Sequence, residues 1–177
     1  MRTGYVLYGA AVAAARDPFL YGTLGVPDTL DGRFDMVGLH VFLAIRRLSA
    51  LPPPGPDLGQ AVFDAMFSDM DVNLREMGVG DLSVGRKNRV MWEAFHGRSA
   101  AYQSALAAGD LAALAAVLGR NVWRGAPIPV FAGAGADAAL ARIAAAQDAG
   151  LATQALADLQ RGAISFLPAH DILAVAA

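Results

Sequence analysis

The chain has 177 residues, of which 55% are apolar and 17% charged, a size and composition typical of one globular domain. Sixteen acidic and fourteen basic side chains give a formal charge of −2, which excludes a general positive field that would attract nucleic acid or an anionic bilayer. The absence of cysteine excludes disulfides, thiolate metal sites and cysteine nucleophiles, and favours the cytoplasm.

The chain begins with an apolar run that follows a single arginine. Two tyrosines and the lack of a small-residue cleavage site favour a first core helix, at about 3–16, over a signal peptide. Uncharged stretches elsewhere, such as Met36 to Ile45, are far shorter than the ~20 residues that a membrane-spanning helix needs. We therefore expect no spanning segment.

Helical periodicity recurs from end to end, whereas no segment alternates apolar and polar residues for long enough to form a strand. The sequence predicts an all-α fold, a single-domain bundle of about seven helices over residues 1–177. The predicted helices occupy residues 3–16, 31–50, 58–77, 83–108, 111–122, 137–149 and 151–161. The proline-rich segment 52–56 is predicted to be a loop. Nineteen of residues 101–150 are alanine, so residues 103–177 are interpreted as a closely packed scaffold.

The predicted helix 31–50 is apolar on nearly all sides, which is typical of a helix at the centre of a bundle or beneath a binding groove. Either Asp28 or Asp31 is expected to cap its N-terminus, because a carboxylate there accepts hydrogen bonds from unpaired backbone donors. His40 is interpreted as a core or boundary histidine rather than as a haem ligand with Met36, since no second ligand motif accompanies it.

Polar residues interrupt the apolar side of the next predicted helix. Asp69, Asn73 and Glu76 follow one another at four- and three-residue spacing, on the same side as apolar residues. Buried carboxylates are costly unless they are paired. We therefore expect that this end of the helix emerges from the core or that Arg33 or Arg98 pairs with it, in preference to a metal site.

The predicted helix 83–108 combines an apolar stripe with a basic outer face. The stripe consists of Val84, Met91, Phe95, Tyr102 and Leu106, and the outer residues are Arg86, Lys87, Arg89, Glu93 and Arg98. This face is either solvated and partly paired or a contact surface for a partner or RNA. Five of the six methionines lie between residues 36 and 91, a pattern that suits either core packing or adaptable apolar partners.

The residues that best fit a catalytic site are a series of carboxylates. It consists of Asp28, Asp31, Asp35, Asp64, Asp69 and Asp71. Two facing acidic helices would hold Mg²⁺ for diphosphate chemistry. The spacing argues against such a site, because no adjacent acidic pair is repeated on both helices, and no phosphate-binding loop or metal-binding histidine pair occurs. A magnesium-dependent helical enzyme acting on diphosphates is therefore the alternative, and a cofactor-free binding protein is preferred.

Several sequence blocks, in one order, resemble the ubiquinol–cytochrome c chaperone family. They are DPFLY at 17–21, GVPDTLDGRFDM at 25–36, FDAMFSDMD at 63–71, LREMGVGD at 74–81 and AFHGR at 94–98. The resemblance is densest over residues 17–102, and Arg120 and Asn121 extend it weakly. His96 departs from the family, in which an aromatic residue, usually tyrosine, is expected.

The resemblance implies a non-enzymatic, cofactor-free assembly factor that binds the newly made cytochrome b apoprotein and assists assembly of the cytochrome bc1 complex. Mitochondrial members also contact the ribosome, which makes the ribosome a second candidate partner. They carry an N-terminal targeting extension, and this chain looks like the shorter bacterial form. We therefore expect a cytoplasmic protein that is peripheral at the inner face of the membrane through its client. A helical adaptor for another client protein is the alternative.

Polar residues that packing alone does not explain predict one partner-binding surface within residues 28–98, apolar in its middle and charged at its rim. Its members are Asp28, Asp31, Arg33, Asp35, Asp69, Asn73, Glu76, Arg86, Lys87 and Arg98.

Overall fold

Helices form almost all of the structure, a computed structural model that describes residues 2–131, 133–153 and 165–175. In chain order they are α1 (Arg2–Ala15), α2 (Pro18–Gly22), α3 (Leu30–Ser49), α4 (Gly55–Glu76), α5 (Asp81–Ala108), α6 (Leu111–Val122), α7 (Ala136–Thr153) and α9 (Ala169–Val175). Two short antiparallel strands, β1 (Val130–Phe131) and β2 (Ala134–Gly135), lie between α6 and α7. The predicted all-α, single-domain fold is confirmed.

The structure differs from the prediction mainly in short elements. The strands and the helices α2 and α9 were not predicted, because segments this short show no measurable periodicity. The helix α4 begins at Gly55 and includes Pro56, which a first helical turn tolerates because its backbone donor has no partner there. Residues 137–149 and 151–153 belong to one helix rather than two, and residues 154–161 of the last predicted helix lie outside the described residues.

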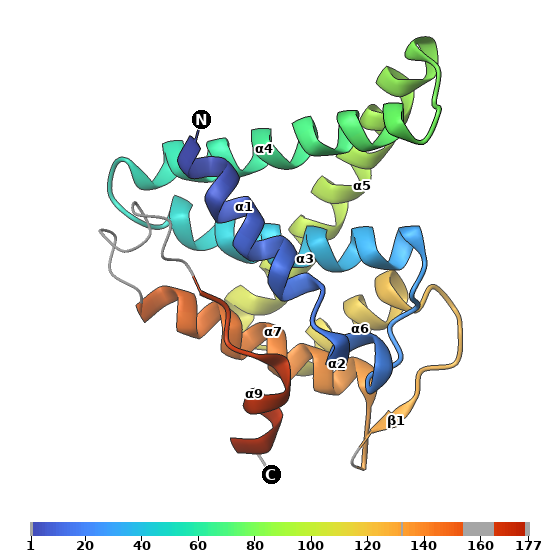
Figure 1. Cartoon of the computed structure of the whole chain (residues 1–177). Helices are drawn as coiled ribbons and strands as arrows, with labels where there is room; N and C mark the ends of the chain where they lie inside the picture. The colour runs from blue at the N-terminus through green and yellow to red at the C-terminus, as the bar shows by residue number, and fades with distance from the viewer. Residues whose placement is uncertain (1, 132, 154–164, 176–177) are drawn as a thin grey trace.

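The helix α3 lies at the centre of the fold, where α1, α4, α5, α6 and α7 pack around it (Figure 1). Its side chains are buried on nearly all sides, as its all-round apolar sequence predicts. His40 is among them, only 1% exposed, and its Nδ1 lies 2.8 Å from the Met36 carbonyl oxygen. The interpretation of His40 as a core residue is confirmed.

A threonine caps the N-terminus of α3. Thr29 has an extended backbone, and its hydroxyl accepts a hydrogen bond of 3.1 Å from the Gly32 amide. The predicted capping by Asp28 or Asp31 is wrong, because the helix begins at Leu30 and places Thr29 at the capping position. The two carboxylates are thereby available for ion pairs with arginines.

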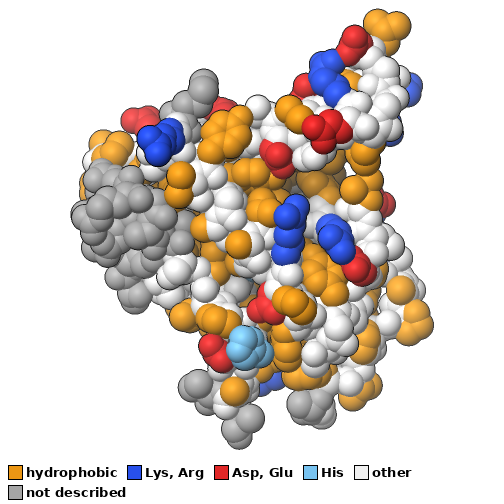
Figure 2. Space-filling model, in the orientation of Figure 1, with side chains coloured by type: hydrophobic (Ala, Val, Ile, Leu, Met, Phe, Trp, Pro, Cys, Tyr) orange, Lys and Arg blue, Asp and Glu red, His pale blue; other side chains and the backbone are white. Residues whose placement is uncertain are grey.

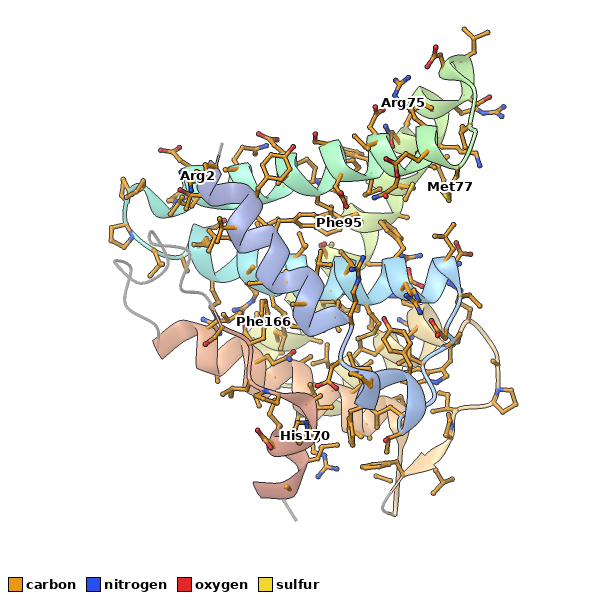
Figure 3. The ribbon with its side chains drawn as sticks, viewed as in Figure 1. Arg2, Arg75, Met77, Phe95, Phe166 and His170 are labelled. Carbon is orange, nitrogen blue, oxygen red and sulfur yellow. The ribbon has the colours of Figure 1, made fainter. Side chains whose placement is uncertain are left out.

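The end of α4 and the start of α5 project from the body as an arm, residues 71–90 (Figure 1). Figure 3 shows Met77 on this arm, whereas Phe95 lies where α5 enters the body. The arm buries few side chains, and Leu82 at its tip is 100% exposed. The predicted apolar stripe of α5 is confirmed in part, since its members are buried at Val84, Phe95 and Tyr102 but only half-buried at Met91 and Leu106.

The alanine-rich helices α6 and α7 pack against each other beneath α3. Small buried residues such as Ala139 and Ala144 permit this close approach. Arg46 and Arg47 near the end of α3 both form ion pairs with Asp148 of α7, which fastens the scaffold to the central helix. Within the described residues, no helix is both long and apolar enough to cross a membrane.

Candidate functional site

A pocket of about 810 Å³ opens between α1, α3, α4 and α5, at the base of the arm. In the space-filling view its mouth is a hollow of hydrophobic side chains with charged residues around it (Figure 2). The apolar lining consists of Val12, Leu30, Phe34, Val37, Met66, Met70, Leu74, Met77, Val90, Met91 and Ala94. Four helices therefore supply one large apolar concavity, the usual form of a binding site.

The pocket gathers basic residues at its rim. Six of the fourteen basic residues of the chain line it, namely Arg16, Arg33, Arg86, Lys87, Arg98 and Arg124. Only three of the sixteen acidic residues do so, namely Asp31, Asp69 and Glu76, and Tyr8 and Asn73 complete the lining. The local charge of the pocket is thus positive although the chain as a whole is slightly acidic.

The two arginines at one end of the pocket converge on Asp35, whose side chain is 0% exposed. Arg98 of α5 pairs with one carboxylate oxygen, and Arg124, which follows α6, donates to the other at 2.7 Å. Arg124 also reaches Asp31 at 3.1 Å. Burial raises the pKa of the Asp35 carboxyl, and the two arginines act in the opposite direction. The cluster ties α3, α5 and the segment after α6 together beneath the pocket.

The opposite side of the pocket contains Asp69 of α4. Tyr8 of α1 donates a hydrogen bond of 2.7 Å to this carboxylate, and the Asn73 side chain donates another of 3.1 Å. Burial, together with the hydrogen bond and charge of Asp69, raises the pKa of the Tyr8 hydroxyl, so that it remains a donor. Of the two outcomes predicted for this end of α4, emergence from the core is confirmed, because Asn73 and Glu76 are exposed. The alternative, a pairing with Arg33 or Arg98, does not occur, since those arginines bind acidic residues around the start of α3.

The basic face of α5 has two parts. Arg89 points away from the pocket and pairs with Glu93 at 2.9 Å, a solvated interaction on one helix face. Arg86 and Lys87 line the pocket and form no ion pair with any other described residue. The solvated interpretation therefore applies to Arg89 and Glu93, whereas a partner contact at Arg86 and Lys87 stays a prediction.

Four of the six methionines line the pocket, and Met36 is fully buried nearby. Met66 and Met70 are buried in its floor, Met91 is half-buried, and Met77 is exposed at its mouth. Methionine side chains are flexible and polarisable, so a surface that contains several of them adapts to apolar partners of different shape. The methionine cluster thus serves both the core and the pocket.

Eight of the ten residues predicted to bind a partner line this pocket. The two exceptions are Asp28, which pairs with Arg33 beside it, and Asp35, which is buried beneath it. The role of all ten residues in binding stays a prediction. Tyr8, Val12 and Arg16 also line the pocket but lie outside the predicted surface, because the sequence indicates only a core helix there. Arg124 lies outside the predicted range 28–98 as well, and no sequence pattern points to it.

The acidic series considered for magnesium does not converge. Asp28, Asp31, Asp35 and Asp71 each pair with an arginine. Asp64 accepts from Gln60, and Asp69 accepts from Tyr8 and Asn73. Among the described residues, no three histidine, aspartate or glutamate side chains lie close enough together to hold a metal ion.

Comparisons with known proteins show what the chain is similar to. A family model described as ubiquinol-cytochrome C chaperone matches residues 22–166, which include most of the pocket. The crystal structure of the Cbp3 homolog from Brucella abortus is similar to this chain, with a TM-score of 0.83 and 33% sequence identity over 96% of this chain and 91% of that one. No curated protein matches the chain significantly.

Proposed function

Since the chain belongs to the ubiquinol–cytochrome c chaperone family, a family of assembly chaperones for the cytochrome bc1 complex, we propose that its client is newly made cytochrome b, which it binds in the pocket between α1, α3, α4 and α5. The observation that carries the proposal is the pocket itself, which combines a large apolar floor with a charged rim. The proposed role is binding without a catalytic step.

The dimensions and chemistry of the pocket suit an apolar segment of a membrane protein. A fully buried leucine or methionine side chain contributes about 1.5–3 kcal/mol. A client segment that inserts three or four such side chains gains several kcal/mol, from which the loss of translational and conformational freedom on association is subtracted. The resulting affinity is moderate, which suits a chaperone that must later release its client.

The proposed location follows from the client. Cytochrome b is inserted into the membrane, so a chaperone that holds it acts from the cytoplasm at the inner membrane face. The ribosome, as the source of the newly made chain, is the second proposed partner. Arg16, Arg86 and Lys87 at the rim are exposed cations available for such a contact.

Deletion of the gene tests the assembly role. We expect the assembled bc1 complex to fall while other respiratory complexes stay nearly normal. Normal levels of cytochrome b in the deletion strain would contradict the client assignment and leave a helical adaptor for another client as the better explanation.

Site-specific photo-crosslinking tests the pocket. A photoreactive residue replaces Val90, which is exposed and lines the pocket, or Leu111, which is exposed on α6 outside it. We expect cross-links to cytochrome b from position 90 and not from position 111. Equal cross-linking from both positions would place the client elsewhere on the molecule.

A further inference from the structure

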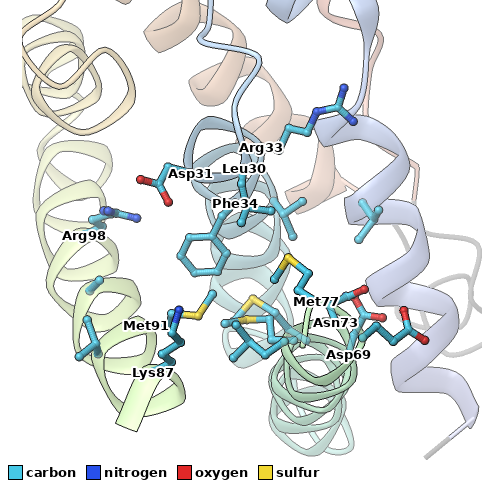
Figure 4. Close-up of a pocket in the computed structure, with 18 of the residues that line it drawn as sticks. Leu30, Asp31, Arg33, Phe34, Asp69, Asn73, Met77, Lys87, Met91 and Arg98 are labelled. Carbon is cyan, nitrogen blue, oxygen red and sulfur yellow. The ribbon is translucent and has the colours of Figure 1, made fainter. Parts of the chain in front are cut away.

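Beside the arm, the α4 and α5 walls of the pocket carry opposite charges, whereas Arg16, Asp31, Arg33 and Arg124 line the pocket near the end of α1 and the start of α3. Lys87 and Arg98 lie eleven residues apart on α5, about three helical turns, and therefore share one face. On α4, Asp69, Asn73 and Glu76 share a face for the same reason. In Figure 4, Lys87 and Arg98 lie on one side of the pocket, with Asp31 near Arg98, and Asp69 and Asn73 lie on the other, with Arg33 farther along toward the start of α3.

No ion pair between described residues joins these two sides. Asp69 is bonded to Tyr8 and Asn73, whereas Lys87 and Glu76 have no ion-pair partner in the described part of the chain. The apolar side chains of Phe34, Met77 and Met91 lie between the two sides (Figure 4). An occupant of the apolar floor beside the arm is therefore flanked by Arg86 and Lys87 of α5 on one side and by Asp69 and Glu76 of α4 on the other, while Arg98 is paired with Asp35.

We infer that the pocket selects an amphipathic helical segment whose apolar face is bordered by carboxylates on one flank and by lysine or arginine on the other. The inference rests on the proposed function, since it specifies which client segments the same pocket holds. A segment with this pattern places each flank against the opposite charge. A segment with two flanks of one sign meets repulsion on one side, and such repulsion is an effective source of specificity.

The charge pattern favours a polypeptide over a lipid. The phosphate of an anionic phospholipid would be attracted to Arg86 and Lys87 on α5, but it would leave Asp69 and Glu76 on α4 without the opposite charge that a polypeptide supplies. A helix is also wide enough to expose separate flanks to the two sides, because its diameter with side chains is about 10–12 Å. Anionic vesicles therefore serve as a competitor in the experiment.

Four designed peptides test the inference. Each is an acetylated and amidated helix with the same leucine and methionine face, and the flanks carry glutamate on one side and lysine on the other, glutamate on both, lysine on both, or glutamine on both. Binding is measured by fluorescence anisotropy at low salt. We expect the mixed-charge peptide to bind about five- to tenfold more tightly than either like-charged peptide, and we expect 1 M salt to remove the difference.

Charge reversal in the protein provides the matched variants. Lys87→Glu places an anion on the α5 side as well and should shift the preference toward the all-lysine peptide. Glu76→Lys makes both sides more basic and should shift it to the all-glutamate peptide. The double variant exchanges the two charges, so it should restore the preference for the mixed-charge peptide. Arg89→Glu, on α5 but outside the pocket, should leave the order of affinities unchanged. All three residues are exposed, so folding is retained.

The outcomes separate this inference from the proposed function. If all four peptides bind equally well, the pocket recognises only apolar surface, and the inference is overturned while the proposed function stands. If no peptide binds, the pocket is not a helix-binding site, and both are overturned. If anionic vesicles displace every peptide and the charged flanks make no difference, a lipid occupies the pocket and the inference is again overturned.

Discussion

The buried histidine at the centre of the fold should make the free energy of unfolding depend on pH. His40 is 1% exposed, its ring lies edge-on to Phe166 with 5.3 Å between ring centroids, and burial lowers its pKa from 6.5 to about 4. In the unfolded chain the imidazole takes up a proton near pH 6.5, whereas in the folded protein it does so only near pH 4. Between these values the unfolded state binds more protons, so the free energy of unfolding decreases as the pH falls.

The full loss is about 3 kcal/mol when the pH has fallen from 7 to below 4, because the whole difference between the two pKa values is then expressed. It is measured by urea unfolding at several pH values, with His40→Leu as the test variant and the exposed His170→Gln as the control. We expect His40→Leu to lose about 3 kcal/mol less than the parent between pH 7 and 4. Equal pH dependence in the parent and in His40→Leu would refute the reasoning that burial keeps this imidazole neutral.

Three further predictions concern the stability of the folded protein. Asp35→Ala should lower the free energy of unfolding, measured in urea, by about 2–3 kcal/mol. This is less than for a fully buried ion pair, because Arg98 and Arg124 are 22% and 42% exposed. An unchanged urea midpoint would show that the cluster does not stabilise the pocket. Gly4→Ala should lower the Tm, because the added Cβ would lie 2.5 Å from a backbone oxygen of α4. Gly9→Ala, on the same helix, is the control: its Cβ would meet nothing within 4 Å, so the Tm should not fall. Millimolar Mg²⁺ should leave the Tm unchanged; a saturable rise that Asp64→Ala abolishes would favour the diphosphate enzyme.

The sequence by itself predicted the helices that build the pocket. Apolar residues on nearly all sides of residues 31–50 leave a helix few positions other than the centre of a bundle, and α3 lies there. Similarly, Asp69 and Glu76 interrupt an apolar helix face, which indicates that this face meets something other than core, and both line the pocket. These inferences hold because helical periodicity is local, so the face on which a residue lies follows from its position in the chain.

The family resemblance also came from the sequence, because it rests on the order of short blocks and not on their arrangement in space. It placed the chain among the chaperones before any contact was known, and the family model and the Brucella abortus structure confirm that placement. It indicated a functional region but not which side chains within that region face a common cavity.

Only the tertiary structure decided how the helices meet. Tyr8 reaches Asp69 across 61 positions and Arg124 reaches Asp35 across 89, and neither pair leaves a periodic signal in the sequence. Near the start of α3, Thr29 rather than Asp28 occupies the capping position, because the helix begins at Leu30 and Asp28 pairs with Arg33. Such choices depend on the packing of all helices at once, whereas a sequence pattern reports only which face of each helix is apolar.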